Sequence, residues 1–421
     1  MPRQSAVTVH APLPPDAVPA VVELLRQIRA EGESGVLLPL ASLPGVHFAR
    51  VFVLEQVGDP DGATIAPSLV YMSDVDLPQH RHLQDLATVA GHGLDALFGR
   101  SPDYPAEPSV EDRVGWLSAH ALSPAAVYVH TRGRSLQQVR DEARLREELE
   151  KMTDDDLGAG RDALAVHARL REQVRSRPDL AWALHGADRS GAPTRLVSIA
   201  MVAGLAVLAI VLLPLLLALL VVFLVAIRLH ERRDVAETGA VDPKHVHDVE
   251  QYEDWATQNP FTAIGFVKAG LVRRVTMRVA LAGLDFANRR FFARNTLAGV
   301  RTLHFARWVP LDDGRRLVFA SSYDGSQESY MNDFIDRLAW GLNLVFSNGV
   351  GYPSTRWLLF GGAHDELAFK RYLRRHQVPT VVWFSAYPTL HAPKVDANAA
   401  LREGLRLELD QPQAERWVAS L

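Results

Sequence analysis

The amino-acid sequence contains one segment twice, and this duplication constrains the fold more than any other feature. Val46-His47-Phe48-Ala49-Arg50 reappears as Leu303-His304-Phe305-Ala306-Arg307. Residues 76–105 then align without a gap with residues 324–353, at a constant offset of 248. Identical residues within that run include Asp85 and Asp333, Phe98 and Phe346, and Tyr104-Pro105 and Tyr352-Pro353. A repeat of this length predicts two homologous domains in one chain.

The two copies have the same order of hydrophobic patterns. Copy one shows strand patterns near 47–54 and 68–73, a helical pattern at 82–98 and a strand pattern at 125–130. Copy two repeats them at 304–310, 316–321, 330–346 and 378–385. This order predicts an α+β fold of two tandem ferredoxin-like sandwich domains that pack as a pseudo-dimer. The expected domains are residues 1–150 and 296–421.

Between the domains, an apolar run predicts membrane embedding. Residues 196–227 contain no charged side chain and are rich in Leu, Val and Ala. At about 1.5 Å per residue, such a helix exceeds a hydrocarbon core of about 30 Å. The expectation is a kinked span or a same-side hairpin with its apex at Pro214, and the equal numbers of basic residues on the two flanks favour the hairpin.

Two further segments complete the predicted organisation. Residues 151–195 are expected to form a charged helical linker, and residues 228–295 a connector. Within the connector, Leu271 to Arg294 interleaves apolar residues with arginines. This pattern suits a basic helix on an anionic membrane surface, or equally a packed helix with solvated arginines.

The composition excludes several classes of function. There is no Cys, so disulfides, thiolate metal sites and cysteine nucleophiles are excluded. The net charge of −4 gives no reason to expect nucleic-acid binding. The N-terminal residues lack the apolar core of a signal peptide. The expected location is therefore an inner or plasma membrane, with the globular domains in the cytoplasm.

The repeated polar residues are the candidates for chemistry. His304 and Arg307 match His47 and Arg50, while Asp324 matches Asp76 at the end of the second hairpin strand. A catalytic interpretation uses His304, Arg307 and Asp324. The structural alternative is a half-buried histidine, a sheet-edge arginine and an aspartate that accepts free backbone N–H groups. Strand alternation predicts that residues i and i+3 point to opposite faces, which separates each histidine from its arginine.

No metal site is expected from the remaining histidines. His80, His82 and His92, and likewise His245 and His247, have no carboxylate at a recognisable third-ligand spacing. Gly-rich phosphate loops and nucleophile elbows are also missing from the sequence.

Ser321-Ser322-Tyr323-Asp324-Gly325 resembles the Gly-x-x-Asp-Gly motif of dye-decolourising peroxidases, although Ser321 replaces the first glycine. Two tandem ferredoxin-like halves are likewise similar to the dimeric α/β-barrel superfamily, to which those peroxidases belong. The resemblance implies a haem cofactor with Asp324 as the distal acid. An axial histidine would then come from His364, His376 or His391.

Three functions are therefore expected in order. The first is a membrane-anchored protein that binds a small or lipid-like ligand at the cleft between the repeats or at the membrane face. The second is a haem-dependent peroxidase-like oxidoreductase, and the third is a non-enzymatic membrane-associated scaffold. The lipid bilayer is the expected partner, and assembly into a homo-oligomer is left open.

Overall fold

The chain divides into two compact units. The computed structural model describes residues 4–157, 162–186, 213–214, 217–254, 256–290, 297 and 299–421. One unit comprises the described residues of 137–226 and 393–421, and the other comprises those of 4–136 and 227–392. We refer to the second as the double-sheet unit, because the described residues form two four-stranded antiparallel sheets within it.

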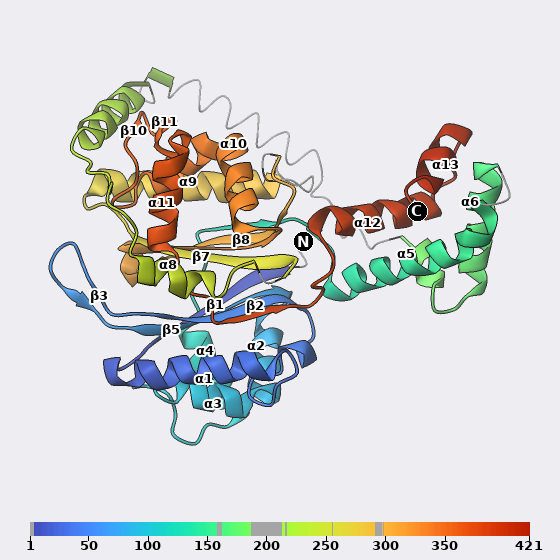
Figure 1. The fold of residues 1–421 in the computed structure, drawn as a ribbon, viewed down its shortest axis with the longest axis horizontal. Coiled ribbons are helices and arrows are strands. Elements are labelled where there is room, and N and C mark those ends of the chain that lie inside the picture. Colours follow the sequence, from blue (N-terminus) through green and yellow to red (C-terminus); the bar gives the residue numbers. More distant parts are fainter. Residues whose placement is uncertain are drawn as a thin grey trace. The chain divides into compact units, whose positions relative to one another are not determined.

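Each sheet combines strands from both repeats. The first sheet has the order β1 (Gln4–Pro12), β5 (Ser68–Asp76), β2 (Val46–Leu54), β12 (Val382–Ser385). The second has the order β6 (Ala126–Val129), β8 (Leu303–Leu311), β9 (Arg316–Asp324), β7 (Gln258–Phe266). Strand β12 of the second repeat pairs with β2, and β6 of the first repeat pairs with β8. In Figure 1 the red-orange β12 accordingly lies beside the blue β2.

This exchange differs from two self-contained sandwiches. The fourth strand of each repeat completes the sheet of the other repeat, with Val382 opposite Val51 and Ala126 opposite Trp308. Strand β1 is an edge strand of the first sheet, and strand β7 is an edge strand of the second. Neither strand was expected from the sequence. Strand β7 and helix α9 (Leu271–Arg290) lie within the predicted connector 228–295, yet they belong to the second sheet and its helical cover.

The two sheets pack face to face with helices outside them. Phe52, Leu54, Val70 and Met72 of the first sheet meet Val309, Leu311, Val318 and Ala320 of the second in one buried cluster. Helices α1 (Val18–Glu31), α2 (Gln79–Val89), α3 (Gly91–Phe98) and α4 (Val110–Ala119) cover the first sheet (Figure 1). Helices α9, α10 (Gln327–Phe346) and α11 (Glu366–His376) cover the second, and α8 (Pro243–Glu250) contacts α11. Because both sheet faces are covered, the strands are buried along nearly their whole length.

The repeats differ where one helix becomes two. The pattern at 82–98 predicts one helix, but α2 ends at Val89 and α3 begins at Gly91, whereas α10 in the second repeat is continuous. Within α3, Gly93 lies against the backbone of another segment, because a Cβ there would lie 1.7 Å from the carbonyl oxygen of Leu37. The chain needs glycine at this close backbone approach.

The helical unit has its own core. It contains α5 (Leu136–Leu157), α6 (Ala163–Ser176), α12 (Ala392–Arg406) and α13 (Gln411–Val418). The first residues of α5 and α12 belong to the double-sheet unit. Leu145, Leu149, Leu170, Leu405 and Trp417 are buried together. Part of the mixed-charge run at 140–151 is also inside, since Glu142 pairs with Arg402 at 3.2 Å. This charged stretch therefore contributes to a packed unit.

The predicted membrane segment is contradicted. In the parts of the chain that the structure describes, no helix is both long enough and apolar enough to cross a membrane. Residues 213–214 are helical, while 196–212 and 215–216 of the predicted segment lie outside the described residues. The expectations of a membrane-embedded insert, a membrane-anchored function and a membrane location are corrected accordingly.

Candidate functional site

Each repeated histidine is the extra residue of a β-bulge. Val46 pairs with Val75 and Phe48 with Asp74, so His47 has no residue opposite it. His304 occupies the same place between Leu303 and Phe305. A bulge re-aims the side chains that follow it. The ring of His47 therefore lies 5.5 Å from that of Phe305, on the opposite sheet.

The bulge corrects the prediction from strand alternation. Arg50 also reaches the opposite sheet, where its guanidinium donates to the carbonyl oxygens of Phe261 (2.9 Å) and Ser321 (2.8 Å). His47 and Arg50 were expected on opposite faces, but one additional residue in the strand brings both toward the second sheet.

His304 and Asp324 form a buried pair that has a counterpart in the first repeat. Nε2 of His304 lies 2.8 Å from Oδ1 of Asp324, and Nε2 of His47 lies 3.1 Å from Oδ1 of Asp76. The second carboxylate oxygen of Asp324 accepts the backbone N–H of Ala392 (2.7 Å), the first residue of α12. Oδ2 of Asp76 accepts the N–H of Leu136, the first residue of α5, at 3.0 Å.

Each aspartate thus joins a bulge, a strand end and the beginning of a helix. A carboxylate at a helix N-terminus satisfies a free N–H group and interacts favourably with the helix dipole. His304 and Asp324 are both nearly inaccessible to solvent, with 1% and 5% of their surfaces exposed. A general acid or base must come within hydrogen-bond reach of its substrate. The duplicated geometry favours a structural role for both pairs.

Arg307 does not join His304 and Asp324. Its guanidinium donates to the carbonyl oxygen of Val7 (2.6 Å) and to Asp74, on the first sheet. Arg50 makes the mirror-image contacts and donates to Ser322, which is the counterpart of Asp74 (2.9 Å). Burial lowers the pKa of Arg50 to about 9, although Asp74 acts in the opposite direction. Of the three predicted site residues, the structure brings two together and places the third between the sheets.

The residues around Asp324 do not fit a haem. An axial histidine and a distal acid occupy opposite faces of the macrocycle. Nδ1 of His391 instead lies 3.7 Å from Oδ1 of Asp324, which leaves no space for a porphyrin between them. His364 and His376 each donate through Nδ1 to a local backbone carbonyl oxygen. The apolar cavity beside His376 has a volume of about 30 Å³, far below that of a cofactor pocket.

Two of the other histidines also have ordinary partners. His82 is buried and contacts the hydroxyl groups of Ser73 (3.0 Å) and Tyr71 (3.1 Å). His245 contacts the carbonyl oxygen of Arg374 at 2.9 Å. Among the described residues, no group of three His, Asp or Glu side chains is placed to hold a metal ion.

A larger cavity lies between α8, α10 and α11. Its volume is about 570 Å³, and it is lined by charges of both signs: Glu250, Glu253, Asp254, Glu328, Lys370, Arg371 and Arg374. Several of these charges already have partners within the protein. Arg374 pairs with Glu253 at 2.6 Å, and Oδ1 of Asp254 accepts the N–H of Gln327 at 2.9 Å. The cavity is open and polar, and its lining does not select one class of ligand.

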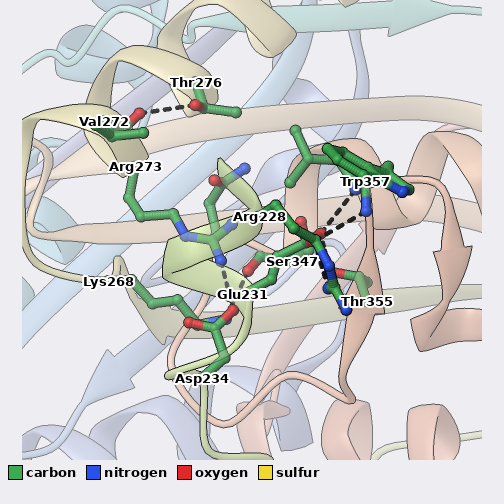
Figure 2. Close-up of polar contacts among 12 residues, drawn as sticks. Arg228, Glu231, Asp234, Lys268, Val272, Arg273, Thr276, Ser347, Thr355 and Trp357 are labelled. Atoms are coloured by element: carbon green, nitrogen blue, oxygen red, sulfur yellow. Dashed lines mark hydrogen bonds and ion pairs between the residues drawn. The ribbon is translucent and has the colours of Figure 1, made fainter. Parts of the chain in front are cut away.

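A charged segment that the sequence analysis missed lies against the second repeat (Figure 2). We call residues 227–240 the strap. Glu231 accepts hydrogen bonds from the hydroxyl of Thr355 (3.0 Å) and the N–H groups of Trp357 (2.9 Å) and Leu358 (2.8 Å). Asp234 pairs with Lys268 (2.7 Å) and with Arg273. The spacing of three between Glu231, Asp234 and Glu237 was the available sequence signal.

The outward face of α9 is unusual in another way. Leu271, Val275 and Val279 have 77%, 44% and 66% of their surfaces exposed, while Arg273 of the same helix is buried. Arg274 and Arg278 are exposed beside them. The helix therefore buries an arginine and exposes a line of aliphatic residues. Phe291, Phe292 and Arg294 of the predicted basic helix lie outside the described residues.

Comparison of the chain with known proteins found no matching family, no similar protein of established function and no similar solved structure. The resemblance to the dimeric α/β-barrel superfamily stays a prediction.

Proposed function

We propose that this protein is a non-catalytic interaction module that binds an acidic amphipathic segment of a partner protein on the outward face of α9. The observation that carries the proposal is the line of exposed Leu271, Val275 and Val279 with Arg274 and Arg278 beside it. Exposed apolar patches flanked by polar residues are typical of interaction sites. Neither arginine has an ion-pair partner among the described residues.

The width of the face supports a helical partner. Successive residues of an α-helix are separated by about 100°, so Leu271, Val275 and Val279 fall within an arc of about 80°. Arg274 and Arg278 lie along one edge of that arc. A narrow apolar seam with charges at its edge resembles the seam used in helix pairing, whereas a helix lying in a lipid interface has a wide apolar face. The charge of the seam favours a partner with glutamate or aspartate.

A peptide-binding measurement tests the proposal. The probe is a labelled helical peptide of about 20 residues, with leucine spaced by three and four and glutamate along one edge, and the readout is fluorescence anisotropy. The wild-type protein is expected to bind it saturably. Val279→Asp is expected to weaken binding at least about tenfold, which corresponds to about 1.4 kcal/mol. Arg278→Glu should weaken it as well and increase affinity for the lysine version of the peptide.

The matched control is Val36→Asp, because Val36 is an aliphatic residue with 89% of its surface exposed but lies in the first repeat. This variant should bind like the wild type. Equal binding by the wild type and Val279→Asp would contradict the proposal. Binding to anionic lipid vesicles with no binding to the peptide would overturn it as well.

A further inference from the structure

The strap is attached to the second repeat by its three carboxylates. Glu231, Asp234 and Glu237 occur at intervals of three residues, and each meets donors that belong to the second repeat. Glu231 binds the 355–358 turn, and Asp234 binds Lys268 and Arg273, as Figure 2 shows. Glu237 pairs with Nη1 of Arg375 at 2.8 Å. The strap is therefore bound in the manner of an acidic peptide.

Apolar burial contributes little to this attachment. Ile227 is buried, but within the strap Leu229 has 51% and Val235 has 80% of its surface exposed. Arg232, Arg233 and the residues from Glu237 to Ala240 are also exposed. The contacts of Glu231 and Asp234 are largely buried, whereas the Glu237–Arg375 ion pair is partly exposed and is therefore screened by salt. An acidic segment that supplies carboxylates to the same donors would replace the buried contacts without leaving those donors unpaired.

We use the word groove for the surface that the strap covers, which consists of Lys268, Arg273, the 355–358 turn and Arg375. This surface has features of an anion site. Trp357 and Leu358 both have φ values of 60°, the left-handed region that costs roughly 1–2 kcal/mol for each non-glycine residue. This conformation aims two successive N–H groups at the same carboxylate, which is the arrangement of an anion-binding nest. Strained backbone of this kind is concentrated at ligand clamps.

The groove also has donors that the strap leaves unused. Arg273 is 1% exposed, and its Nε and Nη1 atoms have no hydrogen-bond partner among the described residues. The buried hydroxyl of Ser347 also has no hydrogen-bond partner among the described residues. The backbone carbonyl oxygen of Ser347 accepts a hydrogen bond from Lys268 at 2.8 Å. Unsatisfied buried donors are costly, so they identify a place where a further acceptor would bind favourably.

From these contacts we infer that the groove formed by Lys268, Arg273, the 355–358 turn and Arg375 is a binding site for acidic peptide segments with carboxylates three residues apart. The strap is its internal occupant. An acidic segment of a partner protein exchanges with the strap and takes over the same donors. This inference does not depend on the proposed function of α9, because it concerns different atoms and a different face of that helix.

The first experiment measures binding of a labelled synthetic peptide with the sequence of residues 227–240. In the wild type the tethered strap competes with the peptide. The variant Asp234→Asn with Glu237→Gln is expected to bind the peptide at least about tenfold more tightly than the wild type, since two of the three strap contacts are weakened. Adding Lys268→Glu should abolish that gain. Glu33→Gln, which neutralises an exposed carboxylate elsewhere, is the matched control and should leave peptide affinity unchanged.

Asp234→Asn leaves the buried Arg273 without its counter-charge, so misfolding of the double variant would obscure the first experiment. A second measurement therefore uses a variant that keeps Asp234. Glu237→Gln changes only a partly exposed ion pair. Trypsin cleavage after Arg232 or Arg233 reports release of the strap. Cleavage should be faster in Glu237→Gln than in the wild type. In the wild type it should accelerate between about 50 mM and about 1 M salt, where the Debye length falls to about 3 Å. Unchanged cleavage together with no peptide binding by either variant would overturn the inference.

Discussion

Positions 74 and 322 are equivalent residues on the middle strands of the two sheets, yet only Asp74 carries a charge. Arg307 pairs with Asp74, and Arg50 instead contacts the hydroxyl of Ser322. Both arginines and Asp74 are almost fully buried. Among these three described residues, two cations thus share one anion between the sheets. Arg50 is tolerated because backbone carbonyl groups and hydroxyls accept from its guanidinium.

The asymmetry gives a prediction at the residue scale. Asp74→Asn removes the only carboxylate that faces Arg307 in the described contacts and should lower the free energy of unfolding by about 3–5 kcal/mol. Ser322→Ala is the matched change in the other repeat and should cost about 1 kcal/mol, since it removes one hydroxyl acceptor. Urea denaturation of both variants measures the difference. Equal losses of unfolding free energy in the two variants would contradict the prediction, because the loss would then depend on the position and not on the buried charge.

At the scale of elements, the repeats use different side chains for the same contact between helix and sheet. In the second repeat the hydroxyl of Tyr330 on α10 donates to Oγ of Ser321 on β9 at 2.6 Å. In the first repeat His82 on α2 contacts Ser73 on β5 at 3.0 Å. Tyr330 and His82 are equivalent in the alignment, as are Ser321 and Ser73. The first repeat has therefore placed a titratable group where the second has a phenol.

This difference makes the attachment of α2 sensitive to pH. Burial lowers the pKa of His82 from 6.5 to about 4. As the pH falls from about 6.5 to about 4, the unfolded chain binds a proton that the folded protein excludes. The stability present above pH 6.5 is therefore lost progressively, by up to about 3 kcal/mol. His82→Gln should flatten the dependence of the melting temperature on pH in this window, whereas His80→Gln, an exposed control on the same helix, should not. The same slope in both variants would contradict the assignment.

At the scale of the whole double-sheet unit, strand exchange makes the repeats interdependent. Strands β6 and β12 each pair with the other repeat, and the inner faces of the two sheets form one buried cluster. A sheet that loses an outer strand exposes a row of unpaired backbone groups and apolar surface. Neither repeat contains all the strands of one sheet.

Fragments of the chain test this dependence. We expect residues 1–136 alone to unfold or to associate with a second copy. Mixing them with residues 227–392 should give a one-to-one complex with restored secondary structure. Light scattering after size exclusion, with circular dichroism, measures both results. A stable, folded monomer of residues 1–136 would contradict the interdependence of the repeats.

Predictions from the sequence were accurate for features set by neighbouring residues. They failed for contacts between residues that are far apart in the chain. The strand patterns at 47–54 and 316–321 correspond to β2 and β9, because a two-residue alternation is local. The helical pattern at 330–346 lies within α10, with Tyr330, Phe334 and Leu338 buried. The role of α9 was left open between a membrane surface and a packed helix, because the same apolar spacing describes a buried face and an exposed one. Arg273, Glu231 and the 355–358 turn could not be brought together from sequence, since their contact requires the folded second repeat.

The sequence by itself determined that the protein is a duplication and where its regular hydrophobic patterns lie, because identity at a constant offset and periodicity are properties of neighbouring residues. It also identified His304 and Asp324 as equivalents of His47 and Asp76. Only the tertiary structure decided that β6 and β12 exchange, that bulges turn the histidines toward the opposite sheet, and that Arg307 lies away from Asp324. Those outcomes depend on pairings between residues far apart in the chain, and their free energies are set by packing that no local pattern records.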